Sequence, residues 1–546
     1  MMRRLLSLVL LLGVYVLLIV AALEIGLRVF QRVPPPEPPG FFWRVPDPVT
    51  GWSLIPNSAG RWYNAMYEFD VDVTVNELGL RTPTPISYTK KNGVYRIMVL
   101  GDSFVEAMQV PIEQTFGHQM GRLLNDVGVH IGHETAEIEI INVGVGSWGT
   151  DQQLLWLRHE GYKYEPDLIL LAFYPANDFM NNYMPLEFAN QKTVRKPWFE
   201  LVNGQLRLNN FPFDPNETRE SRRRLRELTG VATSADNTVS ERNERAEPML
   251  RSVGEWLHQY SALYRYLNPR LRIVAPNLAS RLAQLGVIEP GRESDDLAQG
   301  AAYIPTAYGI YATPLAEPWP QALLTTQAIL AEFKREADQL GAPLRGMLIP
   351  SYEEVDDQQW SRVLQRYPAM QMQRWDTAQP AVLTQRVFDE AGIPLMDLTP
   401  VMRQYAEQGR NLYFRDDRHF TPEGHTMAAH TLASWLTTAP EAALLSVQQP
   451  IPSPARPWGR LLWSVFVWSI VALLVVSLVW SIYKNGPRIW LRNVRLNLGT
   501  AGELLTFLVM RQNFILLPLV VALLIFGGLL IVAQASVVGP FIYTLF

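Results

Sequence analysis

Apolar and polar segments alternate over the middle of the chain in a pattern that predicts an α/β fold. Short runs of β-branched and apolar residues, typical of buried strands, occur at 95–101, 137–144, 167–174, 343–351 and 393–398. Segments with apolar residues at helical spacing lie between them, at 113–127, 150–162, 325–341 and 381–392. Strands separated by helices of this length favour right-handed crossovers. The pattern therefore predicts a mostly parallel sheet with helices on both faces, a three-layer αβα sandwich.

Two regions depart from this alternation. Residues 41–93 indicate β-structure or loops that precede the sheet, and residues 179–315 form an insertion. An insertion at the carboxyl edge of an open sheet lies where ligands bind, which favours a substrate lid. A packing elaboration or a partner surface fits the pattern equally well. The aromatic residues of the insertion could stack on sugar faces or belong to a core. They include Trp198, Phe199, Trp256 and Tyr260.

Three longer apolar segments, at 5–23, 461–482 and 514–533, are long enough to cross a bilayer. The first could also be a cleaved signal peptide, but it is long for one and no small-residue cleavage site follows it. Arg3 and Arg4 precede it, and the loop at 484–511 is basic, so both are expected in the cytoplasm. The sequence therefore predicts a multi-pass protein of the cytoplasmic membrane, with its N-terminus inside and residues 31–458 outside.

Proline-rich linkers at 33–40 and 448–459 frame the part between the membrane segments. The expected organisation is a membrane anchor at 1–30, a linker and lead-in at 31–93, and a catalytic domain at 94–445. A second linker at 446–459 and a two-span membrane region at 460–546 follow.

Composition removes several classes of function. The 546 residues carry a formal net charge of −4, which provides no basic field for nucleic acid. There is no cysteine, so disulfides, thiolate metal ligands and cysteine nucleophiles are excluded. With 48% apolar residues, the chain can bury a large core.

A candidate nucleophile follows the first predicted strand of the sheet. Ser103 stands in Gly-Asp-Ser, where the strand would deliver its side chain to a ligand crevice. A serine nucleophile needs a base, and His419 is the best of eight histidines, because it lies in a loop with acidic neighbours just before a helix starting near Pro422. Asp416 is close enough to orient this histidine; Asp417 could take that role instead, or cap a turn.

Acyl transfer also needs hydrogen-bond donors for a developing oxyanion. Two candidates follow the next two strands. The first is the glycine-rich turn at 142–152, whose backbone N–H groups could converge on a ligand. The second is the segment at 174–179, in which Asn177 could offer a side-chain amide.

These four blocks in this order resemble the SGNH/GDSL hydrolase superfamily. The resemblance implies Ser103 as nucleophile and backbone oxyanion donor, Asn177 as side-chain donor, Asp416 as orienter and His419 as base. In the second block the usual glycine falls on Ser147, with Gly146 beside it, and these two would supply the remaining backbone donor. In the third block Pro175 stands where Gly-x-Asn-Asp normally begins.

Three further segments carry softer resemblances. The lead-in "NELGLRTP" at 76–83 and "GTDQ" at 149–152 are similar to membrane-tethered SGNH proteins associated with envelope polysaccharides, including glycan O-acetyltransferases. The tail, from 499 to 546, resembles a short uncharacterised membrane-protein family. This resemblance suggests that the C-terminal spans dock a membrane-protein partner.

The leading hypothesis is a membrane-anchored serine esterase or O-acyltransferase that acts outside the cytoplasm on acylated envelope glycans or other esters, without cofactor or metal. The alternative is a catalytically inactive SGNH-like domain that binds glycan or serves as a scaffold in a membrane assembly. A metal-dependent hydrolase using His419, His425 and nearby aspartates is a weaker third option, because no compact ligand set is apparent.

Overall fold

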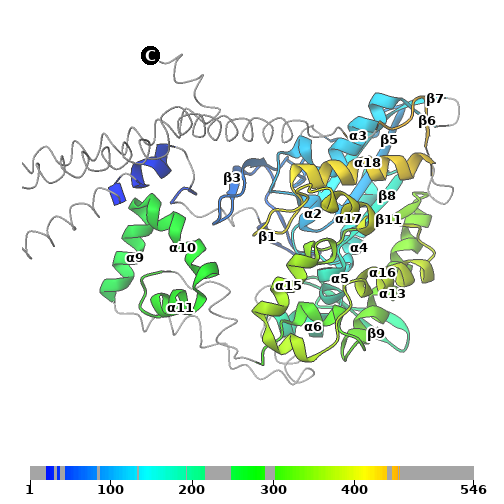
Figure 1. Ribbon diagram of the computed structural model, residues 1–546. Coiled ribbons are helices and arrows are strands. Elements are labelled where there is room, and N and C mark those ends of the chain that lie inside the picture. The colour runs from blue at the N-terminus through cyan, green and yellow to red at the C-terminus, as the bar shows by residue number, and fades with distance from the viewer. Residues whose placement is uncertain are drawn as a thin grey trace, which may run out of the picture. The chain divides into compact units, whose positions relative to one another are not determined.

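The computed structural model describes a large part of the chain between residues 20 and 454 (Figure 1). The described ranges are 20–21, 23–29, 33–36, 44–82, 86–131, 134–191, 194–214, 248–288, 302–438, 445–452 and residue 454. The chain divides into two compact units, residues 23–454 and residues 1–22 with 455–546. The predicted spans at 461–482 and 514–533, and nearly all of 5–23, lie outside the described residues. Among the helices that are described, none is long and apolar enough to cross a membrane.

A seven-stranded sheet organises residues 94–447. Its strand order is β12 (Leu395–Asp397), β11 (Leu344–Leu348), β8 (Leu168–Phe173), β5 (Val94–Gly101), β7 (Glu134–Gly144), β6 (Val129–Ile131) and β13 (Ser446–Val447). The first five are parallel, and β6 and β13 join the edge as antiparallel strands. The predicted α/β class with a mostly parallel sheet is confirmed.

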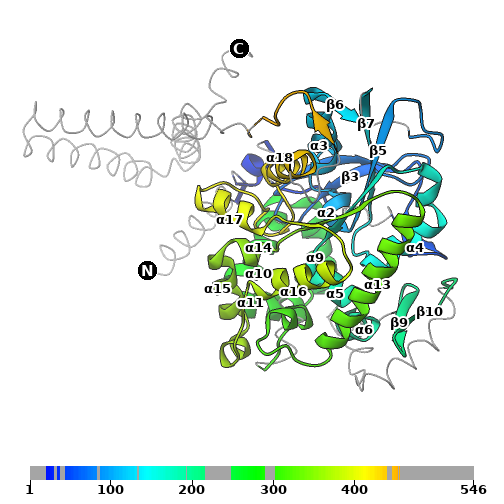
Figure 2. The same cartoon turned by 90° about the vertical axis from the view of Figure 1, so that its right-hand side faces the viewer.

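Helices cover both faces of this sheet. One face packs against α4 (Thr150–His159), α5 (Pro175–Asn181), α13 (Trp319–Gln339) and α16 (Gln379–Glu390). The other packs against α3 (Phe116–Val127), α17 (Thr399–Glu407) and α18 (Pro422–Thr438). Figures 1 and 2 show α3 and α18 in the upper part of this domain and α13 and α16 in its lower part. Because side chains alternate along a strand, β5 sends Met98 and Leu100 into one core and Ile97 and Val99 into the other.

The lead-in forms two antiparallel hairpins. The first pairs β1 (Arg44–Asp47) with β2 (Gly51–Leu54), and the second pairs β3 (Ala59–Tyr63) with β4 (Asp70–Thr74). Short helices supplement the sheet at η2 (Ile112–Gln114), η3 (Gly161–Tyr164), α14 (Tyr352–Val355), α15 (Asp357–Arg366) and η5 (Pro368–Met372). The expectation of β-structure ahead of the sheet is therefore met by hairpins that are separate from it.

The insertion folds in two parts. Its first part holds α6 (Met184–Gln191) and the hairpin of β9 (Trp198–Val202) and β10 (Gln205–Asn209). Its second part holds three helices, α9 (Pro248–Tyr260), α10 (Ala262–Val274) and α11 (Pro276–Gln284). The short η4 (Thr306–Tyr311) then leads to α13. Residues 215–247 and 289–301 of the insertion lie outside the described residues.

Candidate active site

Ser103 begins a short helix, α2 (Ser103–Glu106), directly after β5. The Asp102 side chain accepts a hydrogen bond from the Phe104 N–H at 2.9 Å and so caps this helix. Two glycines permit the tight turn from strand to helix. A Cβ on Gly101 would lie 2.4 Å from a Val105 methyl group, and one on Gly144 would lie 2.0 Å from the backbone nitrogen of Glu106. The predicted delivery of Ser103 at the carboxyl end of the strand follows from this close packing.

Ser103, His419 and Asp417 form a continuous hydrogen-bonded chain. Ser103 Oγ lies 2.7 Å from His419 Nε2, and His419 Nδ1 lies 2.7 Å from Asp417 Oδ1. The Phe104 ring stands 4.8 Å from the imidazole and packs beside it. The sequence placed Ser103 and His419 in one site, 316 residues apart, and the structure brings them into hydrogen-bond contact.

The choice of Asp416 as the orienting acid is corrected by this geometry. Between Phe414 and Phe420 the chain makes a tight turn, closed by a hydrogen bond from the Phe414 N–H to the His419 carbonyl at 2.9 Å. Arg418 adopts a left-handed φ of 69° within it. This turn sets Asp417 against the imidazole, whereas Asp416 is an exposed residue one position earlier.

Glu68 holds the acidic loop in place. Its carboxylate accepts hydrogen bonds from the backbone N–H groups of Asp416, at 3.0 and 3.1 Å, and Asp417, at 3.0 Å. Glu68 is itself fixed by Asn64, whose side-chain amide donates to it at 2.8 Å. Sequence reasoning missed this positioning residue, because it lies in the turn between β3 and β4 and no motif marks it.

The electrostatic surroundings suit His419 to act as a base. Burial lowers the pKa of His419, but the hydrogen bond and charge of Asp417, together with the charges of Asp102 and Glu106, raise it above its usual value. A raised pKa strengthens the imidazole as a proton acceptor and stabilises the imidazolium that forms when it takes a proton.

The structure separates the roles of Gly146 and Ser147. The Gly146 N–H donates to Glu106 Oε2 at 3.0 Å, so this donor is already engaged. The N–H groups of Ser147 and Ser103 meet no acceptor within the described part of the chain. Ser147 is exposed and has a φ of 66°, the left-handed conformation that favours the glycine usual at this place. The prediction that the Gly146 N–H binds the oxyanion is therefore corrected, because this N–H holds Glu106 instead. The Ser147 N–H remains a predicted oxyanion donor.

Asn177 lies in the first turn of α5 and contacts the same site. Its side-chain amide nitrogen donates to Asp102 Oδ2 at 2.8 Å, which links the third strand to the residue before Ser103. Pro175, the departure noted in the third block, stands at the start of α5, where its missing N–H costs nothing. The substitution is thus compatible with the position of Asn177.

Glu106 is a buried carboxylate at the end of α2, only 3% exposed. Besides the Gly146 N–H, it contacts Arg44 Nη2 of β1 at 3.3 Å. Burial raises the pKa of Glu106, whereas the charges of Arg44 and Arg81 lower it. Sequence reasoning did not identify Glu106 or Arg44, because the first is in a helical turn and the second is in the lead-in.

Arg81, in the lead-in segment at 76–83, has a structural role beside α2. Its buried guanidinium donates to the carbonyls of Glu106 and Val110, both at 2.6 Å, and to that of Ala107. One of these carbonyls belongs to the last residue of α2 and the other two lie just after the helix. Arg81 therefore supplies hydrogen bonds to acceptors that have no partner within the short helix. Burial lowers the pKa of Arg81 to about 10, which leaves it charged at neutral pH.

The segment at 149–152 also has a structural role, because its Asp151 belongs to a buried ion pair. Lys196 is fully buried and contacts both carboxylate oxygens of Asp151 at 2.8 Å, the Asn181 carbonyl at 2.7 Å and Glu187 at 3.2 Å. Removing one partner of a buried ion pair costs roughly 3–5 kcal/mol, so this cluster fixes α4 and the insertion against each other.

His425 does not form a metal site with His419. It is buried in α18, accepts a hydrogen bond from the Phe116 N–H at 3.2 Å, and burial lowers its pKa to about 3. No group of three or more His, Asp or Glu side chains that could hold a metal ion occurs among the residues that the structure describes.

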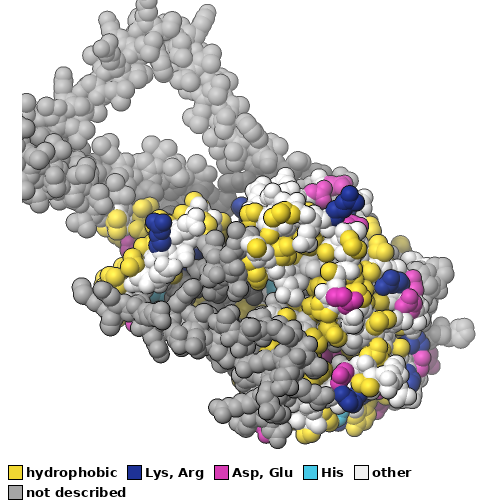
Figure 3. All heavy atoms as spheres, turned by 90° about the horizontal axis from the view of Figure 1, so that it is seen from below, with side chains coloured by type: hydrophobic (Ala, Val, Ile, Leu, Met, Phe, Trp, Pro, Cys, Tyr) yellow, Lys and Arg dark blue, Asp and Glu magenta, His cyan; other side chains and the backbone are white. Residues whose placement is uncertain are grey.

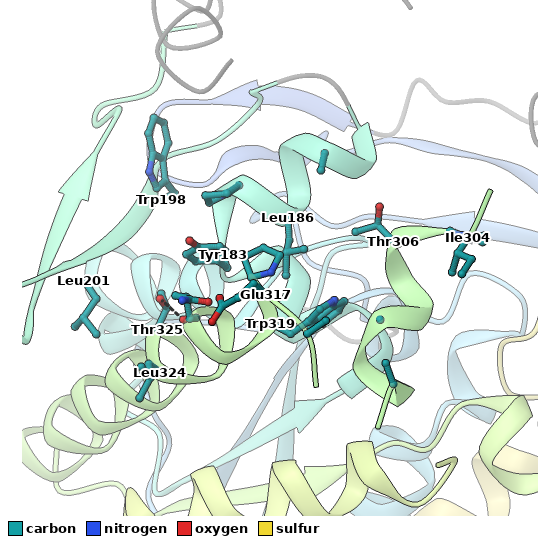
Figure 4. A pocket seen from close by; sticks show the side chains of 18 of the residues that line it. Tyr183, Leu186, Trp198, Leu201, Ile304, Thr306, Glu317, Trp319, Leu324 and Thr325 are labelled. Atoms are coloured by element: carbon teal, nitrogen blue, oxygen red, sulfur yellow. Dashed lines mark hydrogen bonds between the residues drawn. The ribbon is translucent and has the colours of Figure 1, made fainter. Parts of the chain in front are cut away.

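A groove of about 1040 Å³ lies between α6, β9, η4 and the start of α13 (Figure 4). It includes no residue of the hydrogen-bonded chain at Ser103. Aromatic rings line much of it, from Tyr183, Trp198, Phe199, Trp319 and Trp375. Hydrogen-bonding side chains lie among them, from Glu200, Thr306, Glu317, Gln321 and Gln373, and no described lining residue is basic. Trp198 and Phe199 thus line a groove, whereas Trp256 and Tyr260 lie in the three-helix part of the insertion.

Two family models match parts of this chain. Residues 317–455, which include His419 and Asp417, match an SGNH hydrolase-like domain described as acetyltransferase AlgX. Residues 498–546 match a family of unknown function, DUF5989. The resemblance to the SGNH hydrolases is confirmed over residues 317–455 by the first of these models.

Solved structures of esterases match the chain at low sequence identity and low TM-score. A lipase/acylhydrolase from Enterococcus faecalis is 12% identical, covering 65% of this chain and 100% of its own, with a TM-score of 0.27. A catalytic mutant of Axe2, an acetylxylan esterase from Geobacillus stearothermophilus, is 9% identical over 63% and 94%, with a TM-score of 0.28. The acetyl xylan esterase AlAXEase is 11% identical over 63% and 99%, at 0.27. No curated protein matches the chain.

Proposed function

We propose that this protein transfers acyl groups, most simply acetyl, through Ser103, acting as an esterase or O-acyltransferase on an acylated envelope glycan. The observation that carries the proposal is the hydrogen-bonded chain from Ser103 Oγ through His419 to Asp417. A scaffold has no need of this geometry, and no described contact favours that alternative.

The geometry supports a two-step reaction. Ser103 Oγ attacks the ester carbonyl carbon while His419 Nε2 takes its proton, and Asp417 stabilises the imidazolium. The N–H groups of Ser103 and Ser147, with the second amide hydrogen of Asn177, bind the oxyanion. When the intermediate collapses, His419 returns the proton to the departing alkoxide and leaves an acyl group on Ser103.

The second step repeats this chemistry with a new acceptor. His419 removes a proton from water or from a sugar hydroxyl, the acceptor oxygen attacks the acyl carbonyl carbon, and Ser103 recovers its proton as the acyl bond breaks. Water gives free acid, and a sugar hydroxyl gives a new ester. The same residues serve both outcomes, so pocket shape and water exclusion select between them.

A direct assay tests the proposal. The purified full chain is incubated with an activated acetyl ester, with and without a soluble sugar acceptor, and the products are acetate and acetylated sugar. We expect one of these products to form with turnover, and Ser103 to carry the acetyl group when the reaction is quenched early. If neither product forms and no residue is acetylated, the proposal is wrong.

The groove supports a glycan as substrate. Aromatic rings offer flat apolar faces, and the neighbouring carboxylates and amides offer hydrogen-bond partners for hydroxyl groups. Tyr183, two residues after the end of α5, and Leu186 of α6 line this groove (Figure 4), and α5 is the helix that carries Asn177. We infer that it holds sugar residues of a polymer next to the one that reacts.

Replacing Trp198 by alanine should therefore weaken the use of a polymer alone. Loss of one stacking face is expected to raise KM for an acetylated polysaccharide about 2- to 10-fold, and to leave kcat/KM for a small activated ester unchanged. Tyr162→Ala, which removes an exposed ring of η3 outside the groove, is the control. An equal loss on both substrates, or no loss on the polymer, would contradict a role for the groove.

The location of this reaction is part of the proposal. The apolar segments at 5–23, 461–482 and 514–533 and the basic residues beside them support a multi-pass protein of the cytoplasmic membrane with the catalytic domain outside. The C-terminal spans are proposed to contact a membrane-protein partner.

A further inference from the structure

The three helices α9, α10 and α11 form a module, residues 248–288, with its own contacts. Ser261 caps α10 by accepting the Tyr264 N–H at 3.1 Å, and the Tyr264 hydroxyl donates to the Val287 carbonyl at 2.6 Å. Gly254 lets α9 approach the end of the module, because a Cβ there would lie 2.7 Å from the carbonyl oxygens of Gly286 and Val287. The three-helix module is therefore held together by capping, hydrogen bonds and close packing.

This module is tied to the segment that follows the first apolar stretch. Glu24 accepts hydrogen bonds from the Ala262 N–H at 2.6 Å, the Leu263 N–H at 2.8 Å and the Ser261 hydroxyl at 3.0 Å. Although burial raises the pKa of Glu24, these bonds and Arg28 lower it to about 2. The carboxylate thus sits charged on the N-terminus of α10, where the helix dipole favours it.

A second tie comes from the proline-rich linker. Arg265 donates to the Pro34 carbonyl at 3.0 Å, and His258 Nε2 lies 3.2 Å from the Pro36 carbonyl. The module therefore contacts the chain both before residue 30, at Glu24, and after it, at Pro34 and Pro36. If residues 5–23 cross a bilayer, the contact at Glu24 places the module at the level of the membrane surface.

The outer surface of the module is unusually apolar. Eight of its large apolar residues are exposed, including Val274 at 82% and Trp256 at 59%. Tyr260, Leu267, Ile273 and Leu278 belong to the same set. Figure 3 shows apolar side chains grouped on this module, at the left of the view, with a basic side chain among them. Clusters of this kind on a protein surface mark an interaction site.

The charge of the module is opposite to that of the whole chain. Residues 248–288 hold five arginines, no lysine and a single acidic residue, Glu255, which gives a net charge of +4 in a chain whose net charge is −4. Arginine beside exposed tryptophan, tyrosine and aliphatic residues is the composition of helices that lie in the interface of a bilayer. The positive charge complements anionic headgroups.

We propose that the three-helix module rests on the membrane surface, with its exposed apolar residues in the headgroup and acyl boundary of anionic phospholipid. A protein partner or a second copy would bury the same apolar residues, but it would not explain why the module is anchored to the residues next to a predicted span. This inference depends on that span and not on the chemistry at Ser103.

Because the chain has no cysteine, a single introduced thiol can report on the module. The full chain carrying Val274→Cys is labelled with an environment-sensitive fluorophore and reconstituted into vesicles of phosphatidylcholine and phosphatidylglycerol. Lipids bearing a nitroxide in the upper acyl chain are the quencher. Val382→Cys, on α16 and 65% exposed, is the matched control.

The expected result is a blue-shifted emission and strong quenching at residue 274, with neither effect at residue 382. Quenching should weaken when phosphatidylglycerol is omitted, or when Arg251 and Arg281 are both replaced by glutamate. Equal quenching at residues 274 and 382, or none at 274, would overturn the proposal. So would energy transfer between labelled copies without lipid quenching, which identifies a second copy as the occupant.

A small-ester assay on the same preparations keeps this outcome separate from the proposed function. The double arginine variant should retain the activity of wild type, because neither residue belongs to the site at Ser103. Loss of quenching at residue 274 with full esterase activity would therefore concern only the proposed membrane contact of the module. Loss of activity with full quenching would concern only the proposed chemistry at Ser103.

Discussion

Ser103→Ala is expected to abolish covalent labelling by a fluorophosphonate probe and to lower kcat for an activated acetyl ester by roughly 10⁶-fold, the scale for a triad serine. The variant loses the attacking oxygen but keeps its backbone N–H. Because the oxyanion can still be bound, the variant should still hydrolyse the ester faster than the uncatalysed reaction in water. Labelling is read after separation of the purified proteins, and turnover is read from acetate release.

Ser147→Ala provides the matched control for this experiment. The proposed contribution of Ser147 is its backbone N–H, which alanine retains, so labelling should persist and kcat should stay close to that of wild type. Undiminished labelling of Ser103→Ala would show that the probe reacts elsewhere and that Ser103 is not the nucleophile. A large loss in Ser147→Ala would assign a role to the hydroxyl that the geometry does not predict.

The second large effect concerns the two adjacent acids. Asp417→Asn is expected to lower kcat by about 10⁴-fold, because the amide no longer holds the His419 tautomer that accepts a proton at Nε2. Asp416→Asn should change kcat only a few-fold, because the contact of Asp416 with Glu68 is made by its backbone N–H. A large loss in Asp416→Asn with little effect in Asp417→Asn would contradict the arrangement of the loop.

The pH profile separates an effect on His419 from a general loss of structure. The base must be neutral, so kcat/KM should rise with pH through the pKa of His419, which Asp417 helps to raise above its usual value. Without the Asp417 charge that pKa falls, and the acid limb of the residual activity should move to lower pH. An unchanged limb would mean that Asp417 does not act through His419.

Much of the scaffold was predictable because burial on both faces leaves a direct mark on the sequence. Parallel strands covered by helices must be apolar on both sides, so 95–101 and 167–174 read as strands without reference to any partner. The edge strands β6 and β13 were not predicted, because three and two residues are too short to show a period. Nor did the pattern predict the hairpins of the lead-in individually, since their side chains pack on neighbours that lie far along the chain.

The sequence by itself determined the order of the chemistry: a serine at a strand end, donors after the next two strands, and a histidine ahead of the last helix. Only the tertiary structure decided which acid faces the histidine and which backbone donors remain open. The physical reason is that these choices rest on contacts across the fold. Glu68 holds the loop of Asp417 from about 350 positions away, and Glu106 engages the Gly146 N–H from a neighbouring strand end. Local spacing carries no trace of such contacts.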